Sequence, residues 1–529
     1  MSFATLDEAA ARGMSLAWQA SRHPDRTAIF STAGDRSFAQ LNERANRVAH
    51  VLREAGLRPG DGVALLCMNR SEFAEVFFAI QRSGLRLTPI NWHMKPEEVA
   101  YVAADCGARA LIADARFAEA AGLAAEQADT ADVRLAIGGP LPGYEDFEAA
   151  LARVSGEDPE APQLGDTMLY TSGTTGRPKG VRRAMPDPEK AVLGYKILSA
   201  VFDFRPDAAD VALATGPLYH SGPINLCLAI PINHGLPTYL MEKWDAEEML
   251  RLIEKQRVTH TFCVPTMFRR LLALEEDVRR RYDLSTLRFV IHGAAPTPVE
   301  DKRAIIAWLG PIVTEIYAAT EGMGCLVGSE EWLARPGTVG RPAGEIRIVD
   351  GEGEPVPTGE VGTVFLQPVG GGDFEYHGDP DKTAAAKRDG YFTVGDMGYV
   401  DEEGYLFLTG RSAEVIISGG TNIYPAEIDA VLLEHPAVRD GAAVGVPDEE
   451  WGEVVKAVVA LARDADAGDE AAADILAHCR RELATYKTPR SVDFVEEIPR
   501  SEAGKILRRE LRDRYRTRGV SPGTQEEGT

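Results

Sequence analysis

Cysteine is scarce in this chain of 529 residues, and its six copies stand alone. None belongs to a C-x-x-C pair or has a histidine nearby at metal-ligand spacing, which excludes a disulfide scaffold or a cysteine-held metal as the organising feature. Most lie in apolar runs, where cysteine behaves as a small hydrophobic residue. We therefore expect reduced, buried thiols in a cytoplasmic protein. The positions are Cys67, Cys106, Cys227, Cys263, Cys325 and Cys479.

Long apolar runs and an excess of basic residues are absent too. No run reaches about 18 apolar residues, so we expect no membrane-spanning segment. The first residues, MSFATLDEAAARGMSLAW, have neither a basic start nor an apolar stretch, so we expect no signal peptide. The 57 Lys and Arg residues face 81 Asp and Glu residues, a net charge of −24, which argues against nucleic acid or an anionic membrane as partner. Anionic small molecules would then need local basic clusters such as Arg177 with Lys179.

The order of sequence patterns predicts an α/β protein with two lobes. A chain this long exceeds the roughly 250–300 residues that one core can serve. Up to residue 343, short apolar runs alternate with amphipathic helical patterns, which predicts mostly parallel sheets covered by helices. Over residues 344–410, short strand-like runs are separated by turn signals, which predicts a small antiparallel β unit. We expect a large domain over 1–410, a small mobile α+β domain over 411–515, a surface loop at 463–474 and a disordered tail at 516–529.

Residues 171–181, TSGTTGRPKGV, follow a strand-like run that ends at Tyr170. The glycines let the backbone approach a ligand closely, while the hydroxyls, Arg177 and Lys179 offer donors and positive charge. Turned N–H groups and cations suit the phosphate oxygens of a nucleotide. Pro178 stands where a Walker loop has its second glycine, which excludes that motif. Taken alone, the segment could equally be a solvated turn. The residues assigned to nucleotide binding are Thr171, Ser172, Gly173, Thr174, Thr175, Gly176 and Lys179.

Further motifs follow in a fixed order. They are GAAP at 293–296, YAATEG at 317–322, GD at 395–396, TGR at 409–411 and PRSEAGKIL at 499–507. The first two follow predicted strands, and ligands in parallel sheets bind at the carboxyl ends of strands, so we expect the two to share a crevice. Together the motifs resemble the adenylate-forming superfamily, which includes acyl-CoA synthetases, peptide-synthetase adenylation domains and firefly luciferase. The resemblance covers nearly the whole chain.

The resemblance implies that a carboxylic acid is activated by transfer of AMP from ATP, with release of pyrophosphate. A carboxylate is anionic and has no good leaving group, so a site for this step needs positive charge beside the α-phosphate. By resemblance, Lys505 supplies that charge as a catalytic residue. Glu321 holds Mg²⁺, a cation that needs only one or two protein oxygens, and Thr320 bonds a phosphate oxygen.

The remaining site residues are also assigned through the resemblance. Tyr317 packs on the adenine, which lies against the small residues Gly293, Ala294 and Ala295. Asp396 accepts hydrogen bonds from the two ribose hydroxyls, as a carboxylate can from a vicinal diol. Arg411 contacts the same ribose and marks the linker between the lobes.

A second group of residues would serve the acyl and thiol substrates. His220 matches a position that lines the acyl tunnel, although a lone histidine is more often structural. Ser418, Gly419 and Gly420 resemble the loop along which the pantetheine arm of CoA enters, although a plain turn is the alternative. Lys505 and this loop lie on the same small domain yet must address one carbon, so the domain must rotate. The hinge residue, usually Asp or Lys, is Ala413 here.

The leading function is an ATP- and CoA-dependent acyl-CoA ligase with Mg²⁺ as cofactor. An amide synthetase or an acyl-loading enzyme of the same fold is the alternative, a luciferase-like oxidation ranks lower, and a non-catalytic adenylate binder would not need Lys505. We expect residues 217–230 to form part of the acyl pocket wall. They include no acidic side chain that could pair with the ammonium group of an amino acid. We therefore expect an apolar acyl group, aliphatic or cyclic. We expect no nucleic acid and no integral membrane association, and a homodimer is left open.

Overall fold

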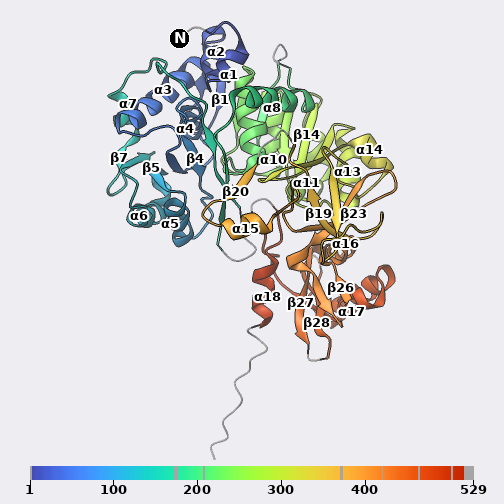
Figure 1. The fold of residues 1–529 in the computed structure, drawn as a ribbon. Coiled ribbons are helices and arrows are strands. Elements are labelled where there is room, and N and C mark those ends of the chain that lie inside the picture. Colours follow the sequence, from blue (N-terminus) through green and yellow to red (C-terminus); the bar gives the residue numbers. More distant parts are fainter. Residues whose placement is uncertain are drawn as a thin grey trace, which may run out of the picture.

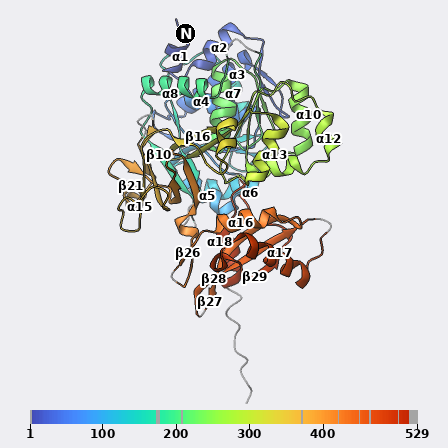
Figure 2. The same cartoon turned by 90° about the vertical axis from the view of Figure 1, so that its right-hand side faces the viewer.

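The computed structural model describes residues 3–171, 177–205, 209–369, 373–419, 421–448, 450–462, 465–501 and 504–516. Within these ranges the α/β architecture is as predicted, and five sheets account for the strands. Figure 1 shows a large body that contains most of the chain and a smaller lobe, built from the C-terminal segment, below it. Figure 2, turned by 90°, shows the same separation.

A nine-stranded sheet forms the centre of the large lobe, in the order β17-β16-β15-β14-β13-β11-β12-β1-β2. Neighbouring strands from β15 to β1 run parallel, and the strands at the two edges run antiparallel. The strands are β1 Thr27–Phe30, β2 Arg36–Ser37, β11 Ala212–Ala214, β12 Thr238–Leu240, β13 His260–Cys263, β14 Phe289–Gly293, β15 Val313–Ala319, β16 Gly322–Gly328 and β17 Arg341–Pro342. Because β14 and β15 are parallel neighbours, their carboxyl ends meet at one edge.

A second sheet of six parallel strands lies beside the first, in the order β7-β6-β5-β3-β4-β8. The strands are β3 Gly62–Leu66, β4 Arg86–Pro89, β5 Ala108–Asp114, β6 Val133–Ile137, β7 Glu145–Asp146 and β8 Asp166–Thr167. Helices α3 (Phe38–Glu54) and α4 (Ser71–Gln81) share one apolar core with strands of both sheets. On α3, the apolar residues Leu41, Ala45, Val48 and Leu52 recur at helical spacing and are fully buried. Its first turn is fixed by a capping box between Ser37 and Gln40.

The other helices of the large lobe cover these sheets (Figure 1). They are α1 Leu6–Ala10, α2 Ser15–Arg22, α5 Pro96–Asp105, α6 Ala118–Gln127, α7 Phe147–Ala152, α8 Pro188–Val201, α9 Ile230–Asn233, α10 Ala246–Gln256, α11 Pro265–Leu272, α12 Glu276–Arg281, α13 Val299–Leu309 and α14 Ser329–Ala334. A π-helical segment, Pro223–Ala229, precedes α9.

Two antiparallel sheets complete the large lobe: the six-stranded one corresponds to the β unit predicted at 344–410, and the three-stranded one also uses strands from before residue 344. The three-stranded sheet joins β9 Leu169–Thr171, β10 Lys179–Arg183 and β20 Phe374–Tyr376. The six-stranded sheet joins β18 Ile346–Val349, β19 Gly362–Leu366, β21 Lys387–Arg388, β22 Tyr391–Phe392, β23 Asp396–Val400 and β24 Leu406–Arg411, and α15 is Pro380–Ala385. Strand β23 begins at Asp396, so the predicted ribose-binding carboxylate belongs to the first residue of a strand.

The small lobe has a sheet and cores of its own. The sheet joins β25 Ile416–Ser418, β26 Thr421–Ile423, β27 Val438–Asp448, β28 Gly452–Leu461 and β29 Ser491–Phe494, and the helices are α16 Pro425–Glu434, α17 Asp469–Glu482 and α18 Arg508–Arg516. Ile416, Ile428 and Leu432 are buried among its apolar side chains. The predicted loop at 463–474 is wrong from Asp469 onward, where α17 begins, because the run of alanines there favours helix. Residues 517–529 of the expected tail lie outside the described ranges.

All six cysteines are buried and free, as expected. Among the described residues, no helix combines the length and the apolar character needed to cross a membrane.

Candidate active site

The glycine-rich segment lies between two paired strands. Thr171 ends β9, Lys179 begins β10, and these two residues face each other in the ladder. The ammonium group of Lys179 lies 5.0 Å from the centre of the Tyr376 ring on β20. Burial and nearby Lys382 lower the pKa of Lys179. Five of the predicted nucleotide-binding residues, Ser172, Gly173, Thr174, Thr175 and Gly176, lie outside the described residues.

Thr320 and Glu321 form the turn between β15 and β16. Strand β15 extends to Ala319, so Tyr317 lies within the strand rather than after it. Glu321 is 6% exposed, and the hydroxyl of Tyr376 donates to its Oε1 at 2.8 Å. Arg183 of β10 donates to the carbonyl of Thr320 at 2.5 Å. The turn is therefore held by β10, which follows the glycine-rich segment, and by β20, which pairs with β10.

Asp396 stands between two partners. The Tyr317 hydroxyl donates to its Oδ2 at 2.7 Å, and Arg411 Nε donates to its Oδ1 at 3.1 Å. Asp396 and Arg411 face each other on β23 and β24, which fixes this contact. Burial and the charge of Asp396 raise the pKa of Tyr317 well above its usual range. Each carboxylate oxygen of Asp396 keeps further acceptor capacity for a ligand hydroxyl.

The segment Gly293–Ala295 follows from the carboxyl end of β14, beside β15. A Cβ on Gly293 would lie 2.5 Å from the carbonyl oxygen of Ile316, so only glycine fits this contact. Ala294 has a φ of 72°, in the left-handed region that a residue with a Cβ rarely adopts. This segment and the 317–321 segment meet at one sheet edge, as the shared crevice requires.

Lys505 lies on a tight turn of the small lobe that reaches the large lobe. Arg500 pairs with Asp440 through Nε and Nη2 at 2.8 and 2.7 Å and donates through Nη1 to the Gly504 carbonyl at 2.7 Å. Gly504 has a φ of 74°, and a Cβ there would lie 3.0 Å from Thr266 Oγ1 in α11. The sequence before Lys505 therefore builds a braced turn that fits against α11.

Charged side chains of the large lobe act on Lys505 of the small lobe. Its side chain keeps access to solvent, yet the protein packed around it lowers its pKa. The positive charge of Arg411 lowers this pKa further, while Asp396, Glu321 and Glu414 oppose the decrease. Lys505 is thus within electrostatic reach of both predicted nucleotide carboxylates of the large lobe.

His220 precedes the π-helical segment and is neutral at ordinary pH. Burial, followed by the charges of Lys505 and His93, lowers its pKa to about 4. Its Nε2 is buried and has no hydrogen-bond partner among the described residues. A neutral ring within electrostatic reach of Lys505 is compatible with the predicted place at the acyl end of the site.

The predicted thiol loop begins at the end of β25, in the sheet of the small lobe. Ser418 ends β25 and pairs with Gly452 at the start of β28. Gly419 has a φ of 55°, and a Cβ there would lie 2.6 Å from the Trp451 ring. The loop is therefore packed against a hairpin of its own lobe, and Gly420 lies outside the described residues.

Several contacts of this site were missed by sequence reasoning. Tyr376 and Arg183 belong to strands whose pairing brings them to Glu321 and Thr320, and Thr266 belongs to a helix that meets the small lobe. Two of these residues had a signal in the sequence: Arg500 belongs to the same motif as Lys505, and Arg183 belongs to a basic pair with Arg182 that could bind an anionic ligand.

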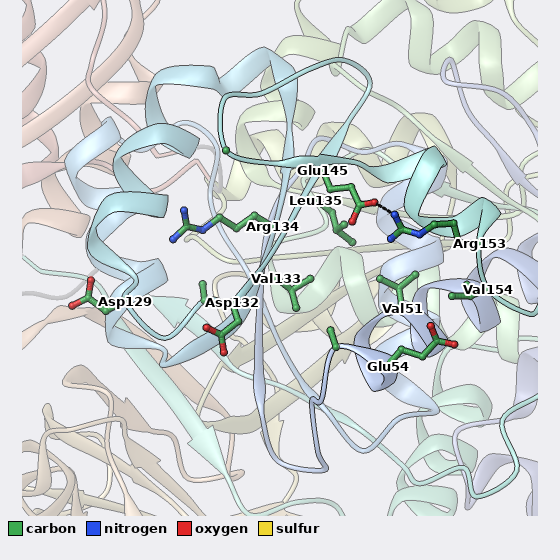
Figure 3. Close-up of a pocket in the computed structure, with 13 residues that line it drawn as sticks. Val51, Glu54, Asp129, Asp132, Val133, Arg134, Leu135, Glu145, Arg153 and Val154 are labelled. Atoms are coloured by element: carbon green, nitrogen blue, oxygen red, sulfur yellow. Dashed lines mark hydrogen bonds and ion pairs between the residues drawn. The ribbon is translucent and has the colours of Figure 1, made fainter.

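A cavity of about 680 Å³ in the large lobe is not this site. Figure 3 shows it between α3, β6 and the segment that carries Glu145 and Arg153, which form an ion pair. None of the predicted site residues lines it. Its side chains carry both signs of charge and offer no convergent set of groups for a reaction.

Glu321 is a carboxylate suited to a metal that arrives with a nucleotide. Within the described residues no three His, Cys, Asp or Glu side chains gather into a protein-only metal cage. Mg²⁺ commonly keeps waters and phosphate oxygens and takes only one or two carboxylates, so this single buried acid fits that requirement.

Comparison with known proteins identifies the family. The model for AMP-binding enzymes matches residues 16–369, and the model for the C-terminal domain of AMP-binding enzymes matches residues 427–505. A fatty acid–[acyl-carrier-protein] ligase from Streptomyces coeruleorubidus is 34% identical over 94% of this chain and 95% of its own length. An indoleacetate–CoA ligase from Aromatoleum aromaticum is 35% identical over 92% of this chain and 95% of its own length.

Solved structures agree with the fold. An anthranilate CoA ligase in complex with anthranoyl-AMP superposes with a TM-score of 0.86 at 28% identity, over 96% of this chain and 98% of that one. An amide bond synthetase from Marinactinospora thermotolerans superposes with a TM-score of 0.80 at 28% identity, over 95% of this chain and 100% of that one.

Proposed function

Because this chain belongs to the family of AMP-binding enzymes, we propose that it is an ATP-dependent carboxylate–CoA ligase. One observation carries the proposal. Lys505 of the small lobe lies within electrostatic reach of Glu321 and Asp396 of the large lobe, while the predicted thiol loop lies on the small lobe, packed against Trp451. This arrangement supports a first half-reaction that uses Lys505 and a second that needs another orientation.

In the first half-reaction, a carboxylate oxygen of the acid attacks the α-phosphorus of ATP, and the bond to pyrophosphate breaks. The products are an acyl-adenylate and pyrophosphate. Asp396 would accept the ribose hydroxyls, with Tyr317 and Arg411 holding its carboxylate in place. Lys505 would balance the charge between the incoming carboxylate and the phosphate.

Glu321 and the backbone around Thr320 would face the phosphates. Mg²⁺, when bound, supplies positive charge at those phosphate oxygens. Glu321 would hold it through a carboxylate that Tyr376 already orients. Thr320 would donate to a phosphate oxygen, with its backbone fixed by Arg183.

In the second half-reaction, the thiolate of CoA attacks the acyl carbon, and AMP leaves. AMP is a good leaving group, so this step needs no strong base. Gly419 and Gly420 would line the path of the pantetheine arm. We place the hinge at residues 410–414 and the lobe boundary at Arg411. Rotation of the small lobe about this hinge would move Lys505 away from the acyl carbon and bring the thiol loop to it.

We propose an apolar acid as the substrate. The segment 217–230 has no acidic side chain, and the Cβ positions of Gly222 and Gly324 would lie 2.9 Å and 2.6 Å from the rings of Phe262 and Tyr317. The two rings therefore pack directly against glycine backbone, and this region presents aromatic surface rather than charged side chains. A cytoplasmic location belongs to this proposal, and a homodimer stays open.

An acceptor other than CoA is the second candidate. The similarity to an acyl-carrier-protein ligase and to an amide bond synthetase supports a carrier thiol or an amine in that place. Both candidates share the first half-reaction.

A pyrophosphate-release assay with a panel of carboxylic acids tests the proposal. Each acid is supplied with ATP and Mg²⁺, alone or with CoA, an amine or an acyl-carrier protein. Turnover with an apolar acid that only CoA stimulates supports the ligase, and stimulation by amine or carrier alone selects the alternative. Absence of pyrophosphate release with every acid would contradict both.

A further inference from the structure

Helix α11 of the large lobe contacts the small lobe at two places. Arg269 donates through Nη2 to the carbonyl of Leu433, near the end of α16, at 3.1 Å. One helical turn earlier, Thr266 lies against Gly504, the residue before Lys505. One short helix therefore touches both a helix of the small lobe and the turn that carries Lys505.

The contact at Leu433 is favourable for a physical reason. The last carbonyls of a helix have no partner within the helix, and the helix dipole makes that end partly negative. Leu433 is the penultimate residue of α16, and its carbonyl faces a guanidinium group. Arg269 is itself oriented by Asp301 of α13, whose Oδ2 lies 3.3 Å from its Nε.

We propose that Arg269 is a positioning residue for the first half-reaction, which holds the small lobe where Lys505 meets the nucleotide site. The proposal rests on the ligase function above. Arg269 lies outside the site, so it acts through the placement of α16 and of the 500–506 turn. Because the thiol loop can reach the acyl carbon only after the lobe rotates, the same contact must break before the second half-reaction.

The rates of the two half-reactions test this role. Arg269→Ala should lower acid-dependent pyrophosphate release about tenfold, the scale of one charge-assisted hydrogen bond. Thioester formation from supplied acyl-adenylate and CoA should be unchanged or faster. Arg269→Lys should restore most of the first rate, because an ammonium group can donate to the same carbonyl.

Arg270→Ala is the matched control, since Arg270 is the next residue of the same helix and is exposed. It should change neither rate. An equal loss of both half-reactions in Arg269→Ala, or no loss in either, would overturn the proposal.

A distance measurement separates this proposal from the ligase function. The native cysteines are buried, so spin labels can be directed to exposed positions by Glu330→Cys on α14 and Glu482→Cys on α17. With ATP bound, we expect one main distance in the parent protein and an additional population in Arg269→Ala. This readout needs no turnover, so it stands even if the acid panel fails. An unchanged distance distribution in Arg269→Ala would overturn the role of Arg269.

Discussion

Lys505 brings a positive charge within electrostatic reach of two carboxylates of the large lobe, Glu321 and Asp396. The protein packed around Lys505 lowers its pKa, and Asp396, Glu321 and Glu414 oppose that decrease. Because we expect this charge to act on the bound nucleotide, removal of the Lys505 side chain is a selective test.

Lys505→Ala should reduce acid-dependent pyrophosphate release by about a hundredfold, the scale seen when one preorganised donor is removed. Thioester formation from supplied acyl-adenylate should remain, because that step does not use the ammonium group. Stopped-flow assays of the two half-reactions check this. Arg509→Ala, an exposed cation on α18, is the control. Equal losses in both steps would contradict the division of roles.

His220 should make stability depend on pH. Folded His220 stays neutral down to about pH 4, whereas unfolded histidine titrates near 6.5. Unfolding therefore takes up a proton between these values, and the free energy of unfolding falls as pH falls from 6.5 to 4. Between pH 7 and pH 5, wild type should lose about 1–2 kcal/mol more than His220→Phe, measured by urea denaturation. His23→Phe, at an exposed histidine, is the control, and equal losses in wild type and His220→Phe would refute the assignment.

At the scale of elements, the proposed hinge carries Ala413 where the family resemblance implies Asp or Lys. The turn Ser412–Glu414 follows β24, and Arg508 of α18 pairs with Glu414 at 2.9 Å. Arg512 donates to the carbonyl of Ala413 at 3.4 Å. The hinge is therefore attached to the small lobe through two arginines, although Ala413 offers no charge of its own.

Ala413→Asp should add an ion pair with Arg512 in the present arrangement. An exposed pair contributes at most about 1 kcal/mol, so thioester formation should slow by no more than about fivefold while adenylation is kept. Single-turnover measurements of each step give the answer. Ala413→Asn adds the same shape without charge and should behave like wild type. An unchanged second step in Ala413→Asp would mean that this position does not bias the lobes.

Local patterns were enough to predict most elements, but not how they meet. Strands β13, β14 and β15 can be recognised as short apolar runs in the sequence, and α3 can be recognised from apolar residues at helical spacing. In contrast, Tyr376 meets Glu321 and Arg183 meets Thr320 only because strands distant in sequence pair side by side. Such contacts depend on sheet order, which no short stretch of sequence contains.

At the scale of the whole molecule, the two lobes have separate apolar cores. Leu432 is fully buried in the small lobe, and Leu250 is 1% exposed in the large one. Leu432→Ala should destabilise the small lobe by about 2–5 kcal/mol, because it leaves a cavity. Calorimetry should then show two transitions, of which only the small-lobe transition shifts, and pyrophosphate release should fall as Lys505 loses its support.

Leu250→Ala is the counterpart for the large lobe and should shift the other transition. A single transition that both variants displace together would contradict independent cores.

The left-handed backbone at Ala294 has a consequence for the thermal stability of the enzyme. A methyl group in that conformation costs on the order of 1 kcal/mol compared with glycine. Thermal tolerance is therefore within reach through the loss of a single methyl group. The same methyl group belongs to the segment that is expected to contact the adenine ring. Ala294→Gly should therefore change both the thermal stability and the affinity for the nucleotide.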